Sequence, residues 1–99
     1  MINKITIRPI AIQEIEEAWH WYEARRKGLG DDFILSIEES LEKISHNPKL
    51  YPIVHKKIRR AIIRRFPFSI LYFTENSKII IIGVFQGNRN PKSWKRRIS

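Results

Sequence analysis

The sequence predicts an α+β fold in one domain: an N-terminal strand, an antiparallel two-helix hairpin packed on a small, mostly antiparallel sheet, and a basic C-terminal tail. Two segments between residues 12 and 44 repeat apolar residues at intervals of three and four positions, which is typical of amphipathic helices. Three apolar, β-branched runs follow between residues 58 and 86. Because 99 residues suffice for one core, we expect residues 1–99 to form a single domain.

The N-terminal segment predicts a strand followed by a helix. Ile5 and Ile7 alternate with polar residues before Pro9, so we expect a short strand with one apolar face. The next stretch predicts a helix to about residue 26, with Trp21 off its apolar stripe, either as a contact residue or as an exposed aromatic without a role. The stripe that we expect to face the core consists of Ile12, Ile15, Trp19 and Tyr22.

A glycine-containing link separates this helix from a second one. Gly28 and Gly30 interrupt the first helix, and Asp31 is the expected N-cap of the second. Pro48 ends the second helix, and residues 49–57, which lack a helical period, are expected to form a loop. Two helices joined this tightly predict an antiparallel hairpin. The apolar stripe of the second helix consists of Ile34, Ile37, Leu41 and Ile44.

Three strands are expected after the loop, at residues 58–65, 67–74 and 78–86. The last two flank residues 75–77, a gap of hairpin size in which Asn76 can adopt the left-handed conformation. We therefore expect these two strands to pair as a hairpin.

The hairpin strands predict a sheet whose centre is covered on both faces. Ile70 and Tyr72 point to one face, and Leu71 and Phe73 to the other, while residues 79–82 are apolar on both sides. A single helical hairpin can cover only one face. The other must be closed by the C-terminal tail, by a second copy of the chain or by an apolar helix of a partner.

Positive charge is concentrated in the second half of the chain. Residues 56–99 hold 12 of the 19 Lys and Arg residues but one of the 10 acidic residues, whereas residues 1–55 carry a small net negative charge. Charge of one sign on one part of a small domain favours a polyanionic or acidic partner. The alternative is a solubilising basic surface.

The composition argues against several other classes of function. The chain has no Cys, and its three His residues lack the spacing of a metal site, so we expect no metal and no cofactor. Its longest apolar run, residues 79–85, is too short to cross a membrane, and its N-terminus has no signal-peptide pattern. We therefore expect a cytoplasmic protein without a membrane partner.

Two arginine doublets bracket an apolar core in the strand expected at residues 58–65. On an extended chain Arg60 and Arg64 would share one face. Arg59 and Arg65 would share the other. Guanidinium groups bind phosphate or carboxylate through two parallel hydrogen bonds, so such a strand could hold RNA or an acidic peptide. The alternative is a strand whose ends extend arginines into solvent.

The C-terminal stretch combines a last strand, a Gly-x-Arg-x-Pro turn at residues 87–91, and then Trp94 among basic residues. The other segments of the same pattern are Trp19-x-x-Tyr22-Glu23, Gly28-x-Gly30-x-x-Phe33, Asn47-Pro48-x-x-Tyr51-Pro52 and Arg64-Arg65-Phe66-Pro67-Phe68-Ser69-Ile70-x-Tyr72. In this order, over nearly the whole chain, they resemble the RelE/ParE superfamily of type II toxins.

This resemblance implies a cognate acidic antitoxin, a toxin–antitoxin hetero-oligomer, and one of two targets. The RelE-like branch cleaves mRNA on the ribosome, whereas the ParE-like branch inhibits DNA gyrase by binding it. Phe68 and Ser69 stand where the first branch tends to carry Arg, Gln86 stands where close relatives often carry His, and Trp94 replaces a tail tyrosine. These departures favour a gyrase inhibitor. A ribosome-dependent mRNA endonuclease and a stand-alone basic nucleic-acid-binding module remain alternatives.

Each target implies its own site residues. If the chain is a ribonuclease, Lys56 and Lys57 would hold phosphates, and the catalytic residues would be Arg59, Arg60, Arg64, Arg65 and Arg89. If it binds gyrase, the contact residues would be Trp94, Lys95, Arg96 and Arg97 in the tail. The antitoxin would cover the open sheet face and the arginine doublets.

Overall fold

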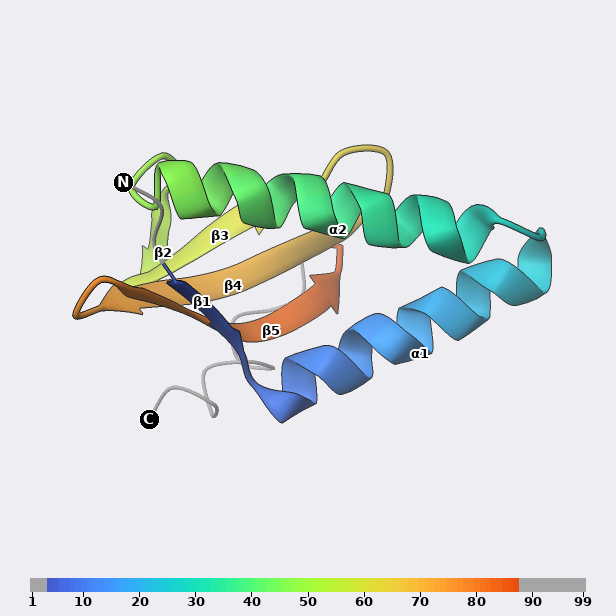
Figure 1. Cartoon of the computed structure of the whole chain (residues 1–99), viewed down its shortest axis with the longest axis horizontal. Coiled ribbons are helices and arrows are strands. Elements are labelled where there is room, and N and C mark those ends of the chain that lie inside the picture. The colour runs from blue at the N-terminus through green and yellow to red at the C-terminus, as the bar shows by residue number, and fades with distance from the viewer. Residues whose placement is uncertain (1–3, 88–99) are drawn as a thin grey trace.

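A computed structural model describes residues 4–87 of the chain, and it has the expected α+β architecture (Figure 1). Two helices form a hairpin that packs on a sheet of five strands. In the described part of the chain, neither helix is long and apolar enough to cross a membrane. The elements are β1 (Lys4–Ile7), α1 (Pro9–Arg25), α2 (Leu29–His46), β2 (Ile53–His55), β3 (Ile58–Ile62), β4 (Phe68–Glu75) and β5 (Lys78–Gln86).

The sheet has the strand order β1-β5-β4-β3-β2. The first and last strands are neighbours and run parallel, with Ile5 opposite Ile79, while the other neighbours are antiparallel. The prediction of a mostly antiparallel sheet is therefore confirmed. Since β5 lies between β1 and β4, it is buried along much of its length.

The hairpin between β4 and β5 turns where the sequence predicts it. Glu75 lies opposite Lys78, and the two residues between them, Asn76 and Ser77, have φ angles of 50° and 62°. Two successive left-handed residues form the type of tight turn whose twist matches a β-hairpin.

The first helix buries only part of the stripe that we expect from the sequence: Tyr22 is buried, but Ile12 is not. Its buried residues are Ala11, Ala18 and Tyr22, whereas Ile12 has 44% of its surface exposed. The prediction for Ile12 is therefore wrong, and Ile15 is only partly buried. The helix thus contacts the core through two small residues and through the ring of Tyr22, which packs against Phe33, Phe66 and Phe68.

The second helix starts earlier than predicted. It begins at Leu29, with Gly28 as its N-cap in the left-handed conformation, so the prediction of Asp31 as N-cap is wrong. The Asp31 carboxylate instead accepts a hydrogen bond of 3.0 Å from the indole N–H of Trp19. The predicted apolar stripe does face the core: Ile37 and Ile44 are buried.

Glu23 and two glycines fix the link between the helices. The Glu23 carboxylate accepts hydrogen bonds from the backbone N–H of Gly28 and of Gly30, at 3.0–3.1 Å. Gly30 also lies against Trp19, where an added Cβ would be 2.9 Å from the Trp19 carbonyl oxygen. The Trp-x-x-Tyr-Glu segment and the Gly-x-Gly segment thus contact each other directly and together form the link between the helices.

Both faces of the sheet are apolar, as the sequence predicts. On the face under the helices, Ile70, Tyr72 and Ile81 of the sheet belong to the larger core cluster together with Phe33 of α2. The opposite face, which we call the second face, carries a smaller cluster of buried residues with Phe73 and Ile80 partly buried beside it. The buried residues of the second face are Ile58, Leu71, Ile82 and Phe85. The two described helices both lie on the face opposite the second face (Figure 1). Closure of the second face by the C-terminal tail, by a second copy of the chain or by an apolar helix of a partner therefore stays a prediction.

The segment between α2 and β4 departs from prediction at two points. Residues 49–57 are not entirely a loop, because β2 pairs there with β3. The strand expected at residues 58–65 ends at Ile62, and Arg65 has a φ of 71°. The two arginine doublets therefore do not lie on one extended strand, and the predicted face sharing between them is wrong.

Candidate functional site

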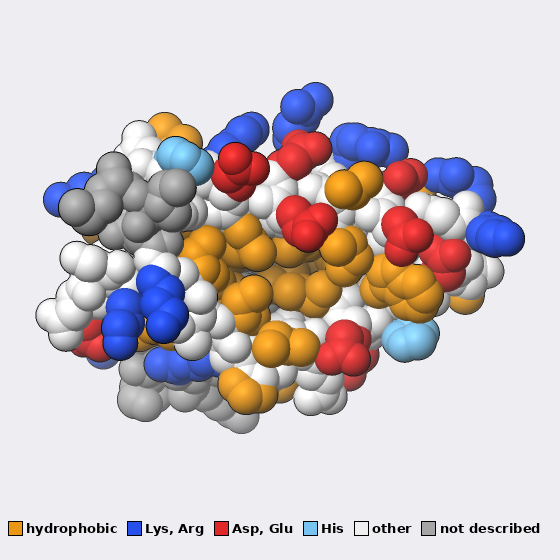
Figure 2. All heavy atoms as spheres, viewed as in Figure 1, with side chains coloured by type: hydrophobic (Ala, Val, Ile, Leu, Met, Phe, Trp, Pro, Cys, Tyr) orange, Lys and Arg blue, Asp and Glu red, His pale blue; other side chains and the backbone are white. Residues whose placement is uncertain are grey.

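Acidic and basic side chains occupy different parts of the molecule. Of the 10 acidic residues, all except Glu75 lie on α1 or α2. Figure 2 shows apolar side chains gathered between the two helices, with acidic side chains along their edges and basic side chains farther out. Among the described residues, the basic ones singled out in the sequence belong instead to β3 and the turns around it.

Arg59 lies on the helix-covered face of β3, opposite Tyr72. Its Nη1 donates hydrogen bonds to the carbonyl oxygens of Tyr51 at 2.6 Å and of Lys49 at 3.3 Å. The guanidinium thereby holds the segment between α2 and β2 against the sheet. Hydrogen bonds from a charged donor are stronger than neutral ones, so this contact is a substantial anchor.

Tyr72 also holds the segment between α2 and β2 to the sheet. Its hydroxyl donates a hydrogen bond of 2.6 Å to the carbonyl oxygen of Pro48. Burial raises the pKa of Tyr72 to about 12, although the nearby Arg59 guanidinium opposes this shift. Burial also raises the pKa of Tyr22. Both phenols stay protonated at neutral pH and act as structural groups rather than as bases.

Arg60 follows on the same strand and lies on the second face, opposite Leu71. Two other cations lie near this face, both over the ring of Phe73: Arg8 at 5.7 Å and Lys57 at 4.4 Å from the ring centroid. We call Arg8, Lys57 and Arg60 the basic margin of the second face. The sequence indicates Lys57 and Arg60 as site residues but not Arg8, which reaches the margin because β1 pairs with β5 at the far end of the sequence.

The β2–β3 turn contains Lys56 and Lys57. Lys56 has a φ of 51° and is exposed. The ammonium group of Lys57 lies 3.4 Å from a carboxylate oxygen of Glu75, with both side chains more than half exposed. Such an exposed ion pair contributes little to stability, so Lys57 can exchange this partner for another anion at small cost.

The second arginine doublet lies in the loop between β3 and β4. Arg64 is exposed, and the guanidinium of Arg65 lies 3.7 Å from the carboxylate of Asp32. The same carboxylate lies 3.6 Å from Arg26 at the end of α1. Asp32 thus brings together two arginines that are far apart in the sequence. Nothing in the sequence indicates this role of Arg26, because only the fold places Arg26 and Arg65 beside the same carboxylate.

The residues proposed for RNA cleavage are therefore dispersed where the structure describes them. Arg59 lies on one face of the sheet, Arg60 on the other, and Arg64 and Arg65 in a loop. Arg89, Trp94, Lys95, Arg96 and Arg97 lie outside the described residues. Their assignment as site residues stays a prediction.

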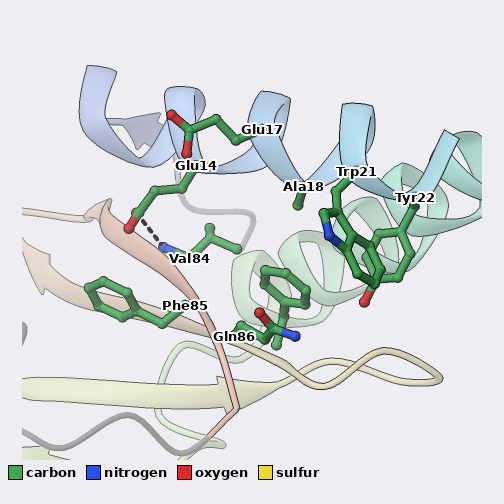
Figure 3. A pocket seen from close by; sticks show the side chains of 9 residues that line it. Glu14, Glu17, Ala18, Trp21, Tyr22, Val84, Phe85 and Gln86 are labelled. Atoms are coloured by element: carbon green, nitrogen blue, oxygen red, sulfur yellow. Dashed lines mark hydrogen bonds between the residues drawn. The ribbon is translucent and has the colours of Figure 1, made fainter. Parts of the chain in front are cut away.

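A cavity of about 290 Å³ lies between α1 and the end of β5 (Figure 3). The carboxylate of Glu14 crosses it and accepts a hydrogen bond of 3.0 Å from the backbone N–H of Val84. Trp21 extends from α1 toward Gln86, at the exposed end of β5. Among the described residues, no group of three or more His, Cys, Asp or Glu could hold a metal ion. The residues that line the cavity are Glu14, Glu17, Ala18, Trp21, Tyr22, Phe68, Val84, Phe85 and Gln86.

Comparison with known proteins identifies the fold. No protein-family model matches the chain, and no curated protein sequence does. A solved structure of the chromosomal ParDE toxin–antitoxin system from P. aeruginosa matches with a TM-score of 0.78 and 13% identity, over 88% of this chain and 98% of that one. The isolated RelE toxin of E. coli matches with a TM-score of 0.65 and 12% identity, over 98% of this chain and 99% of that one.

A third structure, the RelBE2 toxin–antitoxin complex from Mycobacterium tuberculosis, matches with a TM-score of 0.63 and 12% identity, over 87% of this chain and 99% of that one. Each likeness spans nearly the full length of the matched chain. The resemblance drawn from sequence motifs is confirmed at the level of the fold: this chain has the fold of the RelE and ParE toxins.

Proposed function

We propose that this chain is the toxin of a type II toxin–antitoxin pair and that it acts in the cytoplasm by binding DNA gyrase. The fold supports the first part of this proposal, since solved structures of ParDE, RelBE2 and RelE share it. Fold alone does not choose between the two targets, because unrelated activities are often built on one scaffold. The arguments for gyrase or for the ribosome as the target therefore rest on the positions of the side chains.

The observation that carries the choice of gyrase is the dispersal of the described arginines. Cleavage of RNA at the 2′-OH needs groups that reach one point, to move a proton and to stabilise the developing charge. Arg59 is bonded to backbone carbonyls and Arg65 lies beside Asp32, while Arg60 lies on the opposite face of the sheet. The buried phenols of Tyr22 and Tyr72 do not supply a base either. A toxin that acts by binding needs no such convergence.

A supercoiling assay tests the proposal directly. Refolded protein that arrests growth when expressed is added to purified gyrase, plasmid and ATP. We expect inhibited supercoiling and accumulation of cleaved plasmid. Unchanged supercoiling by protein of proven toxicity would refute gyrase as the target.

Ribosome-dependent mRNA cleavage is the second candidate, supported by the likeness to E. coli RelE over 98% of this chain. On this reading Arg89, which the motif shares with both branches, would be the main catalytic cation. Arg89→Ala would then abolish cleavage of mRNA in a translation extract, whereas removal of residues 94–99 would relieve gyrase inhibition first if gyrase is the target. Toxicity that survives both changes would contradict the assignment of both sites.

The second face supports an acidic antitoxin as the partner. Its apolar cluster, which includes Leu71 and Ile82, is flanked by the basic margin of Arg8, Lys57 and Arg60. An amphipathic segment that carries acidic residues beside apolar ones would match both features. Such a complex is a hetero-oligomer whose electrostatic part weakens as salt rises.

A further inference from the structure

The end of the molecule where α1 and α2 meet carries exposed cations from two distant parts of the sequence (Figure 2). Arg26 and Lys27 follow α1, and Arg64 and Arg65 lie in the loop between β3 and β4. We call these four residues the basic ridge. We propose that the basic ridge binds the phosphate backbone of duplex DNA. The choice of DNA rests on the proposed function, because gyrase acts on DNA, but the binding itself needs no gyrase.

One carboxylate draws the two parts of the basic ridge together. Oδ2 of Asp32 lies 3.6 Å from a guanidinium nitrogen of Arg26 and 3.7 Å from one of Arg65. The two guanidinium groups are therefore neighbours in space, although they are far apart in the sequence. Because a single negative charge lies between two positive ones, the net charge at this point is positive and attracts a further anion.

The arginines of the basic ridge keep their hydrogen-bond donors available. Both contacts with Asp32 are longer than a hydrogen bond, and the side chains of Arg26, Arg64 and Arg65 donate no hydrogen bond to another described residue. The Arg26 and Arg65 side chains are also 62% and 61% exposed. A guanidinium presents its donors as a planar fork that fits two oxygens of a phosphate. These side chains can therefore bind a phosphate without first breaking a hydrogen bond.

The other carboxylates at this end of the molecule have partners within the link between the helices. Glu23 accepts hydrogen bonds from backbone N–H groups of the link, and Asp31 accepts one from the indole of Trp19. Asp32 is thus the described carboxylate that competes with an incoming phosphate for the arginines.

The surface around the basic ridge favours nucleic acid over a protein or a membrane. None of the exposed large apolar side chains of the described chain lies within residues 22–34 or 63–69. Protein interfaces depend on apolar or aromatic anchors at their centre, and helices that lie on membranes insert apolar side chains. A phosphate backbone is bound through cations and hydrogen-bond donors alone. The basic ridge offers these groups without an apolar anchor.

The test is fluorescence anisotropy of a short labelled DNA duplex, titrated with the full-length protein at several salt concentrations and without gyrase. Each phosphate contact contributes about 0.9 to the slope of log K against log salt, so Arg26→Gln/Arg65→Gln should reduce this slope by about two. The matched control is Lys4→Gln/Lys78→Gln. Both lysines are exposed and lie opposite each other at the start of β1 and β5, away from the link between the helices (Figure 1). This control removes the same charge and should leave the slope unchanged.

A second variant acts in the opposite direction. Asp32→Asn removes the carboxylate that competes with phosphate, so it should strengthen DNA binding by about two- to fivefold at low salt. Glu16→Gln removes the same charge from an exposed position of α1 and should change binding by less than about twofold. The contacts of Asp32 involve exposed arginines and add little to stability, so circular dichroism should show that all four variants are folded.

Three results would overturn the proposal. The first is an Arg26→Gln/Arg65→Gln variant with the native slope, which would place the DNA on other cations of the chain. The second is an equal effect of Asp32→Asn and Glu16→Gln. The third is displacement of the DNA by polyglutamate as readily as by unlabelled DNA, or tighter binding of duplex RNA, which would make an acidic protein or RNA the ligand. Because gyrase is absent from this assay, its failure is distinct from a failure of the supercoiling assay.

Discussion

Arg59 offers a direct way to separate an anchoring role from a catalytic one. Its Nη1 donates to the carbonyl oxygens of Tyr51 at 2.6 Å and Lys49 at 3.3 Å. A hydrogen bond from a charged group contributes about 1.5–3 kcal/mol, and the second, longer bond shares the same nitrogen. We therefore expect Arg59→Ala to lower the free energy of unfolding by about 2 kcal/mol. For a domain of this size that corresponds to a fall in Tm of about 8–16 °C.

The assay is thermal unfolding followed by circular dichroism, with Arg60→Ala as the matched control. Arg60 lies next to Arg59 but on the opposite face, and its removal should change stability by less than about 0.5 kcal/mol. If Arg59→Ala keeps the native Tm and still loses activity, the anchoring argument fails and Arg59 acts in the chemistry.

Three further predictions address the link, the buried phenol and the basic margin. Gly30→Ala should destabilise the protein by about 1–3 kcal/mol, measured by urea unfolding, because the new Cβ would meet the Trp19 carbonyl oxygen at 2.9 Å. The raised pKa of Tyr72 means that the folded state holds the phenol proton more tightly than the unfolded state does. The contribution of Tyr72 to the free energy of unfolding should therefore be fully present below about pH 10 and should be lost between pH 10 and about pH 12. This loss should be smaller in Tyr72→Phe. Lys57→Ala and Arg60→Ala should each weaken antitoxin binding at low salt and reduce its salt dependence, as measured by calorimetry; a salt dependence equal to that of the native protein would contradict the role of the margin.

The parts of the fold that could be predicted are those with a local cause. Asn76 and Ser77 form the predicted hairpin because the left-handed conformation is a property of the turn itself. The stripe of α2 was predictable because its large apolar residues make the contact with the core. In α1 the contact is made through Ala11 and Ala18 as well as Tyr22, and counting large residues finds Tyr22 but selects Ile12 in place of its neighbour Ala11.

The parts that could not be predicted depend on pairing between distant segments. The run of residues 58–65 looks like one strand, but its partner β4 begins only at Phe68, so pairing ends at Ile62 and the following arginines enter a loop. Asp31 resembles an N-cap in the local sequence, yet its carboxylate bonds to Trp19 on the preceding helix. For the same reason, neither the position of Arg8 at the basic margin nor the cavity below α1 had a signal in the sequence.

The dispersal of the arginines also changes what a loss of activity would mean. A substitution at Arg59 would remove an anchor of the segment before β2, and one at Arg65 would remove its contact with Asp32. Either could reduce toxicity through the fold, whichever target the toxin has. The side chains of Arg60 and Arg64 make no ion pair or hydrogen bond with another described residue, so their substitution tests function with less interference from stability. Evidence for catalysis therefore has to come from Arg60, Arg64 and Arg89, with the Tm of each variant measured beside its activity.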